Sequence, residues 1–243
     1  ISNYTKNNLI ELAGIVESAK NENCIDEIKG ICDEQLAHSR DSIIALYISG
    51  MLGLKKGTMD NTSLNTLVDI FEKNHKTVIV THLCETILAD DPNNRFALRT
   101  LARCYSEDKD NSNKVWDLYE KIVKLDFEEA DLAKLLAEHY EGEGSKDAKK
   151  NAADYYKKAL LRYINAKNTA AVSAVWTKLL QLAEDSEDAN AFDNEYDFFM
   201  LVQRKVAKTI SEDKSALLLW DLYNHYSKAK KWDTAIDLLK SIL

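Results

Sequence analysis

The sequence is poor in the two residue types that make most turns. Its 243 residues contain one proline and seven glycines, whereas average usage would give roughly twelve prolines and about seventeen glycines. β-Sandwiches and α/β folds need these residues for their turns, so the composition argues against both fold classes. We therefore expect an all-α protein.

The sequence also lacks long apolar runs, paired cysteines and a surplus of positive charge. No stretch approaches the roughly 18 consecutive apolar residues of a membrane span, and the first residues do not resemble a secretion leader. No C-x-x-C spacing joins the cysteines, which indicates reduced, partly buried thiols at Cys24, Cys32, Cys84 and Cys104. The net charge of −8 argues against direct binding of nucleic acid, whose affinity depends on neutralised phosphates. We predict a cytoplasmic protein that does not contact membranes.

What the sequence has instead is nearly continuous helical periodicity. Leu9, Leu12 and Val16 open an apolar face, and similar faces follow along the chain between short polar connections. About thirteen helices fit this pattern. Asp91 and Pro92 predict a helix start, with Asp91 as the N-cap and Pro92 as the first helical residue.

The helical pattern repeats about every 34 residues, two helices at a time. The first helix of each unit carries Leu64, Leu67, Val68 and Phe71; Leu98, Leu101, Ala102 and Tyr105; Ala133, Leu136, Ala137 and Tyr140; or Leu219, Leu222, Tyr223 and Tyr226. The second helix carries Val80, Cys84 and Ile87; Val115, Tyr119 and Ile122; Ala152, Tyr156 and Ala159; or Ala235, Leu239 and Ile242. The second-helix markers are spaced by four and then three residues, so each set shares one face.

This period, with small residues at tight-packing positions, resembles tetratricopeptide repeats. The resemblance implies a right-handed superhelix (an α-solenoid) of antiparallel helix pairs. We expect residues 1–60 to form helices that cap the array, and 61–166 to form tetratricopeptide-like repeats. Residues 167–215 would be an irregular helical segment and 216–243 a final, truncated repeat. That truncation, and a first residue that is not methionine, indicate a piece of a longer protein.

A narrower resemblance is carried by residues 41–47, 98–105, 129–138, 153–159 and 232–239. These stretches resemble the long N-terminal helical extension of spirochaetal Gre-type transcript cleavage factors. In that family the extension precedes a Gre module, whose coiled coil enters the RNA polymerase secondary channel and stimulates hydrolysis of backtracked RNA. The resemblance covers most of the chain but none of the Gre module, so no catalytic residue carries over. It implies RNA polymerase as a candidate partner.

No motif for metal binding or catalysis stands out. The histidines form no paired cluster with metal-ligand spacing and are interpreted as surface and packing residues: His38, His75, His82, His139 and His225. Nucleophile-elbow and phosphate-loop motifs are missing. The glycines are interpreted as helix ends and loops, notably Gly50, Gly53, Gly57, Gly142 and Gly144. We expect no enzyme, no cofactor and no metal.

The repeat register implies a partner-binding groove. The first helix of each tetratricopeptide pair lines the concave side, which places there Arg99, Arg103, Lys134, Glu138, Trp220, Asn224 and Lys228. The basic members suit an acidic peptide or a C-terminal carboxylate. The alternative is that these side chains are merely solvated.

Basic clusters elsewhere alternate with Asp and Glu, which favours salt-bridged exposed faces over a nucleic-acid surface. They are Lys146, Lys149, Lys150, Lys157 and Lys158; Arg204, Lys205 and Lys208; and Lys228, Lys230 and Lys231. Aromatic residues are interpreted as fillers between helices rather than base-stacking platforms: Trp116, Trp176, Trp220, Tyr155 and Tyr156.

Three functions follow as hypotheses. The preferred one is a noncatalytic helical-repeat interaction domain of a Gre-type elongation factor, which docks or regulates the factor on RNA polymerase. The second is a general tetratricopeptide-like adaptor for an acidic or C-terminal peptide of an unrelated partner. The third, an all-α enzyme, has no residue constellation in its support.

Overall fold

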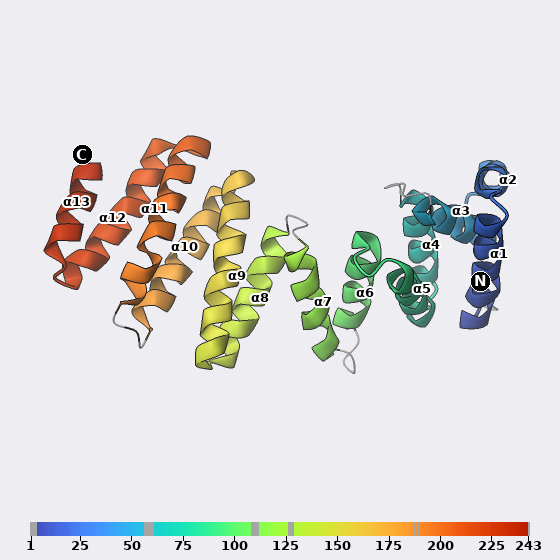
Figure 1. Cartoon of the computed structure of the whole chain (residues 1–243), viewed down its shortest axis with the longest axis horizontal. Coiled ribbons are helices and arrows are strands. Elements are labelled where there is room, and N and C mark those ends of the chain that lie inside the picture. Colours follow the sequence, from blue (N-terminus) through green and yellow to red (C-terminus); the bar gives the residue numbers. More distant parts are fainter. Residues whose placement is uncertain are drawn as a thin grey trace. The chain divides into compact units, whose positions relative to one another are not determined.

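The computed structural model describes residues 4–55, 61–107, 112–125, 129–186, 188 and 190–242. Over these residues the chain forms thirteen α-helices and no strand, which confirms the all-α prediction (Figure 1). The chain divides into two compact units, Ile1–Leu118 and Tyr119–Leu243. No helix in the described part is both long and apolar enough to cross a bilayer.

The first unit contains six complete helices and the start of a seventh. They are α1 (Lys6–Asn21), α2 (Ile25–His38), α3 (Ile43–Lys55), α4 (Thr62–Lys73), α5 (Thr77–Asp90), α6 (Arg95–Glu107) and α7 (Ser112–Lys124), which the division crosses. The central helix is α3, because every residue from 45 to 53 is buried. It packs against α1, α2 and α4. A helix that is apolar on all sides needs this enclosure.

Two glycines of α3 correct an expectation, because Gly50 and Gly53 lie inside the helix and are buried. A Cβ atom at Gly50 would lie 2.6 Å from Cγ and Cδ2 of Leu64 on α4. The missing side chain therefore allows α4 to approach α3 closely. Gly144 does end a helix, α8 (Ala130–Glu143), with a left-handed φ of 71°, and Gly57 lies outside the described residues.

The α5–α6 turn contradicts the predicted helix start. Asp91 caps the end of α5, and its Oδ1 accepts a hydrogen bond from the Asn93 N–H at 3.1 Å. The N-cap of α6 is instead Asn94, whose Oδ1 accepts from the Ala97 N–H at 3.1 Å. Asp91 and Pro92 thus build the turn, because an Asp side chain readily bonds the backbone two residues on.

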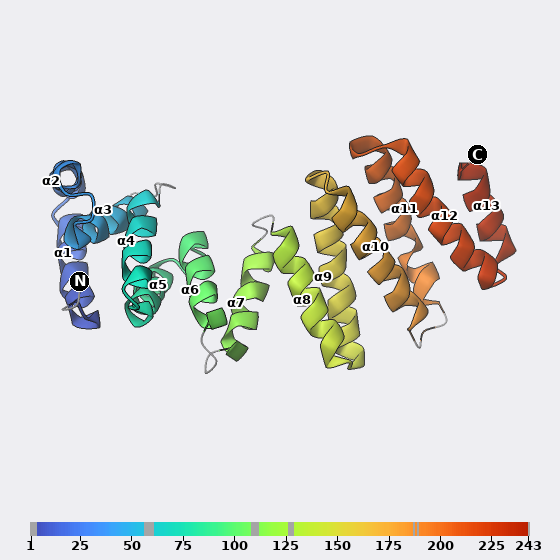
Figure 2. The same ribbon diagram turned by 180° about the vertical axis from the view of Figure 1, so that it is seen from behind.

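The second unit contains the end of α7 and six complete helices, α8 (Ala130–Glu143), α9 (Lys146–Asn165), α10 (Thr169–Glu184), α11 (Ala191–Thr209), α12 (Glu212–Lys228) and α13 (Trp232–Ile242). Each helix from α8 onward packs against the next, and α9 also contacts α11. Consecutive helices of this unit lie side by side in both views (Figures 1 and 2). Side-chain oxygens of Ser145, Asn168 and Ser211 cap α9, α10 and α12.

Small and aromatic residues make the core of the second unit. The predicted tight-packing alanines of α8 and α9 are buried: Ala137, Ala152 and Ala159. Trp176 is 1% exposed and meets Phe199 edge-on, with ring centroids 5.1 Å apart. The interpretation of Trp176 as a filler between helices is therefore confirmed, whereas Trp220 is 46% exposed and fills no such space.

Candidate functional site

Arg99 and Arg103, the first predicted groove residues, lie one turn apart on α6 of the first unit. Nη2 of Arg103 donates to Oε1 of Glu72 on α4 at 2.7 Å. Partial burial, with the nearby Arg95 guanidinium, lowers the pKa of Arg99. The structure thus adds Arg95 to the predicted pair. Arg95, Arg99 and Arg103 lie in a row on α6, four residues apart. The helical spacing of three arginines was the signal that would have identified it.

Lys134 and Glu138 lie on α8 of the second unit and pair with each other, with Nζ and Oε1 3.2 Å apart. Both side chains are about half exposed. A lysine and a glutamate four residues apart on a helix commonly pair in this way. Much of the positive charge predicted at this point of the groove is therefore balanced by the neighbouring carboxylate.

Trp220, Asn224 and Lys228 follow one another along one face of α12. The Trp220 ring stacks on Tyr223 with centroids 5.1 Å apart, while Lys228 is exposed and Asn224 is half-buried. The structure brings these three together on a single helix. Along the second unit, α9, α10 and α11 come between them and the α8 pair.

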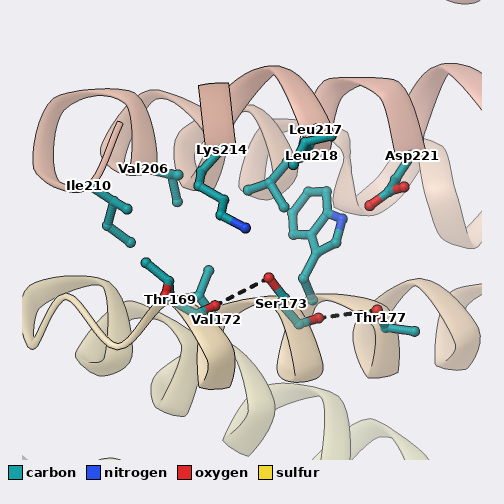
Figure 3. Close-up of a pocket in the computed structure, with 11 residues that line it drawn as sticks. Thr169, Val172, Ser173, Thr177, Val206, Ile210, Lys214, Leu217, Leu218 and Asp221 are labelled. Atoms are coloured by element: carbon teal, nitrogen blue, oxygen red, sulfur yellow. Dashed lines mark hydrogen bonds between the residues drawn. The ribbon is translucent and has the colours of Figure 1, made fainter. Parts of the chain in front are cut away.

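A pocket that sequence analysis missed lies among α10, α11 and α12, with a volume of about 220 Å³ (Figure 3). One wall is a row of hydroxyl residues of α10, namely Thr169, Ser173 and Thr177. The facing wall belongs to α12 and comprises Lys214, Leu217, Leu218 and Asp221. The two walls run in the same direction, with Lys214 nearer the start of α10 and Asp221 beside Thr177 (Figure 3).

The floor of this pocket is apolar but contains one buried donor. Trp176, Val172 and Val206 line it and are almost fully buried. The indole N–H of Trp176 makes no hydrogen bond of normal geometry within the described residues. Burial raises the pKa of the Asp221 carboxyl, and the nearby Trp176 N–H opposes part of that rise. A buried donor without a good hydrogen-bond partner costs free energy. This cost makes the pocket floor around Trp176 a candidate binding site.

Lys214 gives the pocket its positive end. Its side chain points into the space between the two walls (Figure 3). No carboxylate of the described chain lies within ion-pair distance of its ammonium, in contrast to Lys157 with Glu195 at 2.6 Å and Lys231 with Asp193 at 2.5 Å. Lys157 and Lys231 thus form the salt bridges that were predicted for their clusters. The lysine in the pocket is the one that a bound anion would neutralise.

A second pocket, of about 330 Å³, lies among α1, α3 and α5 of the first unit. Lys55 lies in its wall and pairs with Glu17 at 2.8 Å and Asp90 at 2.7 Å. Burial alone would lower the pKa of Lys55, but hydrogen bonds to the two carboxylates outweigh it and raise the pKa. The Lys55 ammonium is thus neutralised within this pocket, and its two ion pairs join α3 to α1 and α5.

Ionisable groups elsewhere also join helices. Oε1 of Glu141 on α8 accepts from Lys178 of α10 at 2.8 Å, and its Oε2 accepts from the Tyr156 hydroxyl of α9 at 2.7 Å. Glu120 accepts from Tyr140 in the same way. All four cysteines are free thiols, and in the part of the chain that the structure covers no three His, Cys, Asp or Glu side chains converge as a metal site would require.

Comparison with known proteins relates the whole chain to Gre-named proteins. No protein-family model matches it. A putative GreA-associated domains protein of Treponema pallidum is 40% identical over 240 residues, 99% of this chain and 34% of that protein. Transcription elongation factor GreA of Borreliella burgdorferi is 30% identical over 243 residues, all of this chain and 25% of that protein. The chain therefore spans about a third or less of these relatives.

Proposed function

We propose that this chain is the noncatalytic interaction segment of a Gre-type transcription elongation factor and that it docks or regulates the factor on RNA polymerase. The observation that carries the proposal is the match of the entire chain to two Gre-named proteins that are three to four times longer. A segment of this length, beside a separate Gre module, suits a role in binding. We place its action in the cytoplasm, with no cofactor.

The helical arrangement supports a binding role. We propose that the helices of each unit stack as tetratricopeptide-like pairs in a right-handed superhelix. Support comes from the buried alanines at the predicted positions and from the contacts of each helix with its successor in the second unit. Such stacking leaves extended surfaces on one side of a helical array, which suit protein partners.

The exposed charges supply candidate contacts for the polymerase. Arg99 and Arg103 present guanidinium groups on α6, which can bond carboxylates in two parallel contacts. Lys134 adds an ammonium on α8. Because Arg103 and Lys134 already have carboxylate neighbours, we expect exchange of partners on binding rather than capture by unpaired charge.

An adaptor for an acidic or C-terminal peptide of an unrelated partner is the second candidate function. It is favoured by the α10–α12 pocket, where the Lys214 ammonium faces an apolar floor. A peptide carboxylate would find a cation there without displacing an internal ion pair. This function needs no polymerase.

The proposal is tested by sedimentation of the purified chain with core RNA polymerase of the same organism at physiological salt. We expect cosedimentation, and its loss in an Arg99→Glu, Arg103→Glu and Lys134→Glu variant that retains its helical circular dichroism. A matched variant reverses Lys205, Lys208 and Lys240 instead and should bind normally. Absence of binding by the unmodified chain would refute polymerase docking and leave the adaptor function as the better account.

A further inference from the structure

One wall of the α10–α12 pocket carries a cation and an anion, and neither forms an ion pair with another side chain among the described residues. Lys214 and Asp221 are seven residues apart on α12, so they share a face and are separated by about 10.5 Å along the helix axis. Leu217 lies between them and is 55% exposed. The wall therefore runs from a cation through an apolar side chain to an anion.

The facing wall offers hydrogen-bond acceptors to a peptide backbone. Thr169, Ser173 and Thr177 are four residues apart, or about 6 Å along the helix axis. A peptide in the polyproline II conformation has no internal hydrogen bonds, so its N–H groups are free to donate to such a row. The Ser173 hydroxyl donates to the Thr169 carbonyl at 3.2 Å and the Thr177 hydroxyl to the Ser173 carbonyl at 3.1 Å. Their donor is thus used, and the hydroxyl oxygens remain as acceptors for peptide N–H groups.

The apolar floor suits a side chain between the two charges. The Trp176 ring and the aliphatic side chains of Val172 and Leu218 are buried, with the pocket above them. A peptide in the polyproline II conformation has three residues per turn and rises about 3.1 Å per residue, so residues three positions apart share a face and lie about 9 Å apart. An acidic residue and a basic residue at this spacing would thus reach both charged ends of α12.

We propose that this pocket binds an extended peptide segment with an acidic residue at Lys214, an aliphatic residue over Trp176 and a basic residue at Asp221. The two charged residues of the peptide are three positions apart. The inference deepens the proposed interaction role by naming the chemistry of a bound segment. Its test uses synthetic peptides, so that it can fail while polymerase binding survives, and the reverse.

The first test compares three fluorescent peptides with Gly-Ser flanks on the unmodified chain, measured by anisotropy up to about 1 mM. Their central sequences are Asp-Leu-Val-Arg, the rearranged Leu-Asp-Arg-Val and the doubly acidic Asp-Leu-Val-Glu. We expect saturable binding of the first and affinities about tenfold weaker for the other two. Equal affinities for all three, or no binding by any, would overturn the proposal.

The second test changes the pocket. Lys214→Glu should weaken Asp-Leu-Val-Arg about tenfold, and Asp221→Lys should make Asp-Leu-Val-Glu the preferred peptide. The matched control Lys205→Glu, an exposed lysine of α11 outside the pocket, should change affinity less than about twofold. The proposal is wrong if Lys214→Glu binds like the control, or if Asp221→Lys keeps the original preference. Circular dichroism of each variant separates loss of binding from loss of fold.

Discussion

Substitution of Gly50 by alanine should destabilise the first unit, although alanine is the better helix former. In the interior of α3, Gly→Ala alone would stabilise by about 1 kcal/mol. The added Cβ would lie 2.6 Å from two carbon atoms of Leu64, against an ordinary carbon contact of about 3.5–4.0 Å. Leu64 is fully buried and must shift by about 1 Å, and such overpacking costs about 1–3 kcal/mol. We expect a net loss of about 1 kcal/mol.

Hydrogen exchange measured by mass spectrometry on peptides from α3 and α4 is the suitable assay, because a chain of two compact units need not unfold in one step. Gly14→Ala in α1 is the matched control, since nothing lies within 4 Å of its added Cβ. It should stabilise by about 1 kcal/mol. In a Leu64→Ala background, Gly50→Ala should become stabilising as well. If Gly50→Ala stabilises the parent chain as much as Gly14→Ala does, the close α3–α4 approach is wrong.

Three further predictions concern other parts of the chain. Ala137→Leu should overpack the α8–α9 contact, since Ala137 is fully buried, and cost about 1–3 kcal/mol; unchanged thermal stability would contradict the repeat register. Ser145→Ala removes the α9 N-cap that accepts from the Ala148 N–H at 3.1 Å and should cost about 1 kcal/mol, whereas Ser145→Asp should retain stability in the same melts. Burial, with the Asp90 charge, raises the pKa of Tyr47 from 10.0 to about 12. Because the unfolded chain loses that proton first, stability falls as pH rises from 10.0 to about 12, and Tyr47→Phe should show a shallower fall in alkaline urea titrations.

The helical class and the buried repeat positions were accessible from sequence because they are local. Scarcity of proline and glycine, and apolar residues three and four apart, already determine helices whose small residues face a neighbour. Ala137 and Ala152 are buried as predicted. The ion pairs of the predicted groove residues were not identified from the sequence. In the structure Lys134 pairs with Glu138 and Arg103 pairs with Glu72.

Features that depend on tertiary contacts could not be predicted from the sequence. From the sequence alone, Gly50 resembles a glycine at a helix end. Its role inside α3 becomes clear only from the close approach of Leu64. Asp91 and Pro92 carry a turn signal that is equally compatible with a helix start three residues later, and only the Asn94 hydrogen bond decides between the two.

The α10–α12 pocket could not be predicted from the sequence for the same reason. The residues of its two walls are more than thirty positions apart in the sequence, in a stretch where the 34-residue period fades. Trp176 has the spacing of any core aromatic, and nothing local distinguishes Lys214 from the other lysines of these helices. The predicted boundaries at residues 60, 166 and 215 stay predictions.

An equilibrium titration decides whether this chain is an interaction segment for RNA polymerase. Fluorescently labelled chain is titrated with core RNA polymerase of the same organism at about 0.15 M salt, with unlabelled chain as competitor. We expect saturable binding that the unlabelled chain displaces and that the Arg99→Glu, Arg103→Glu and Lys134→Glu variant does not displace. A signal that never saturates, or that the charge-reversed variant displaces equally well, would contradict it.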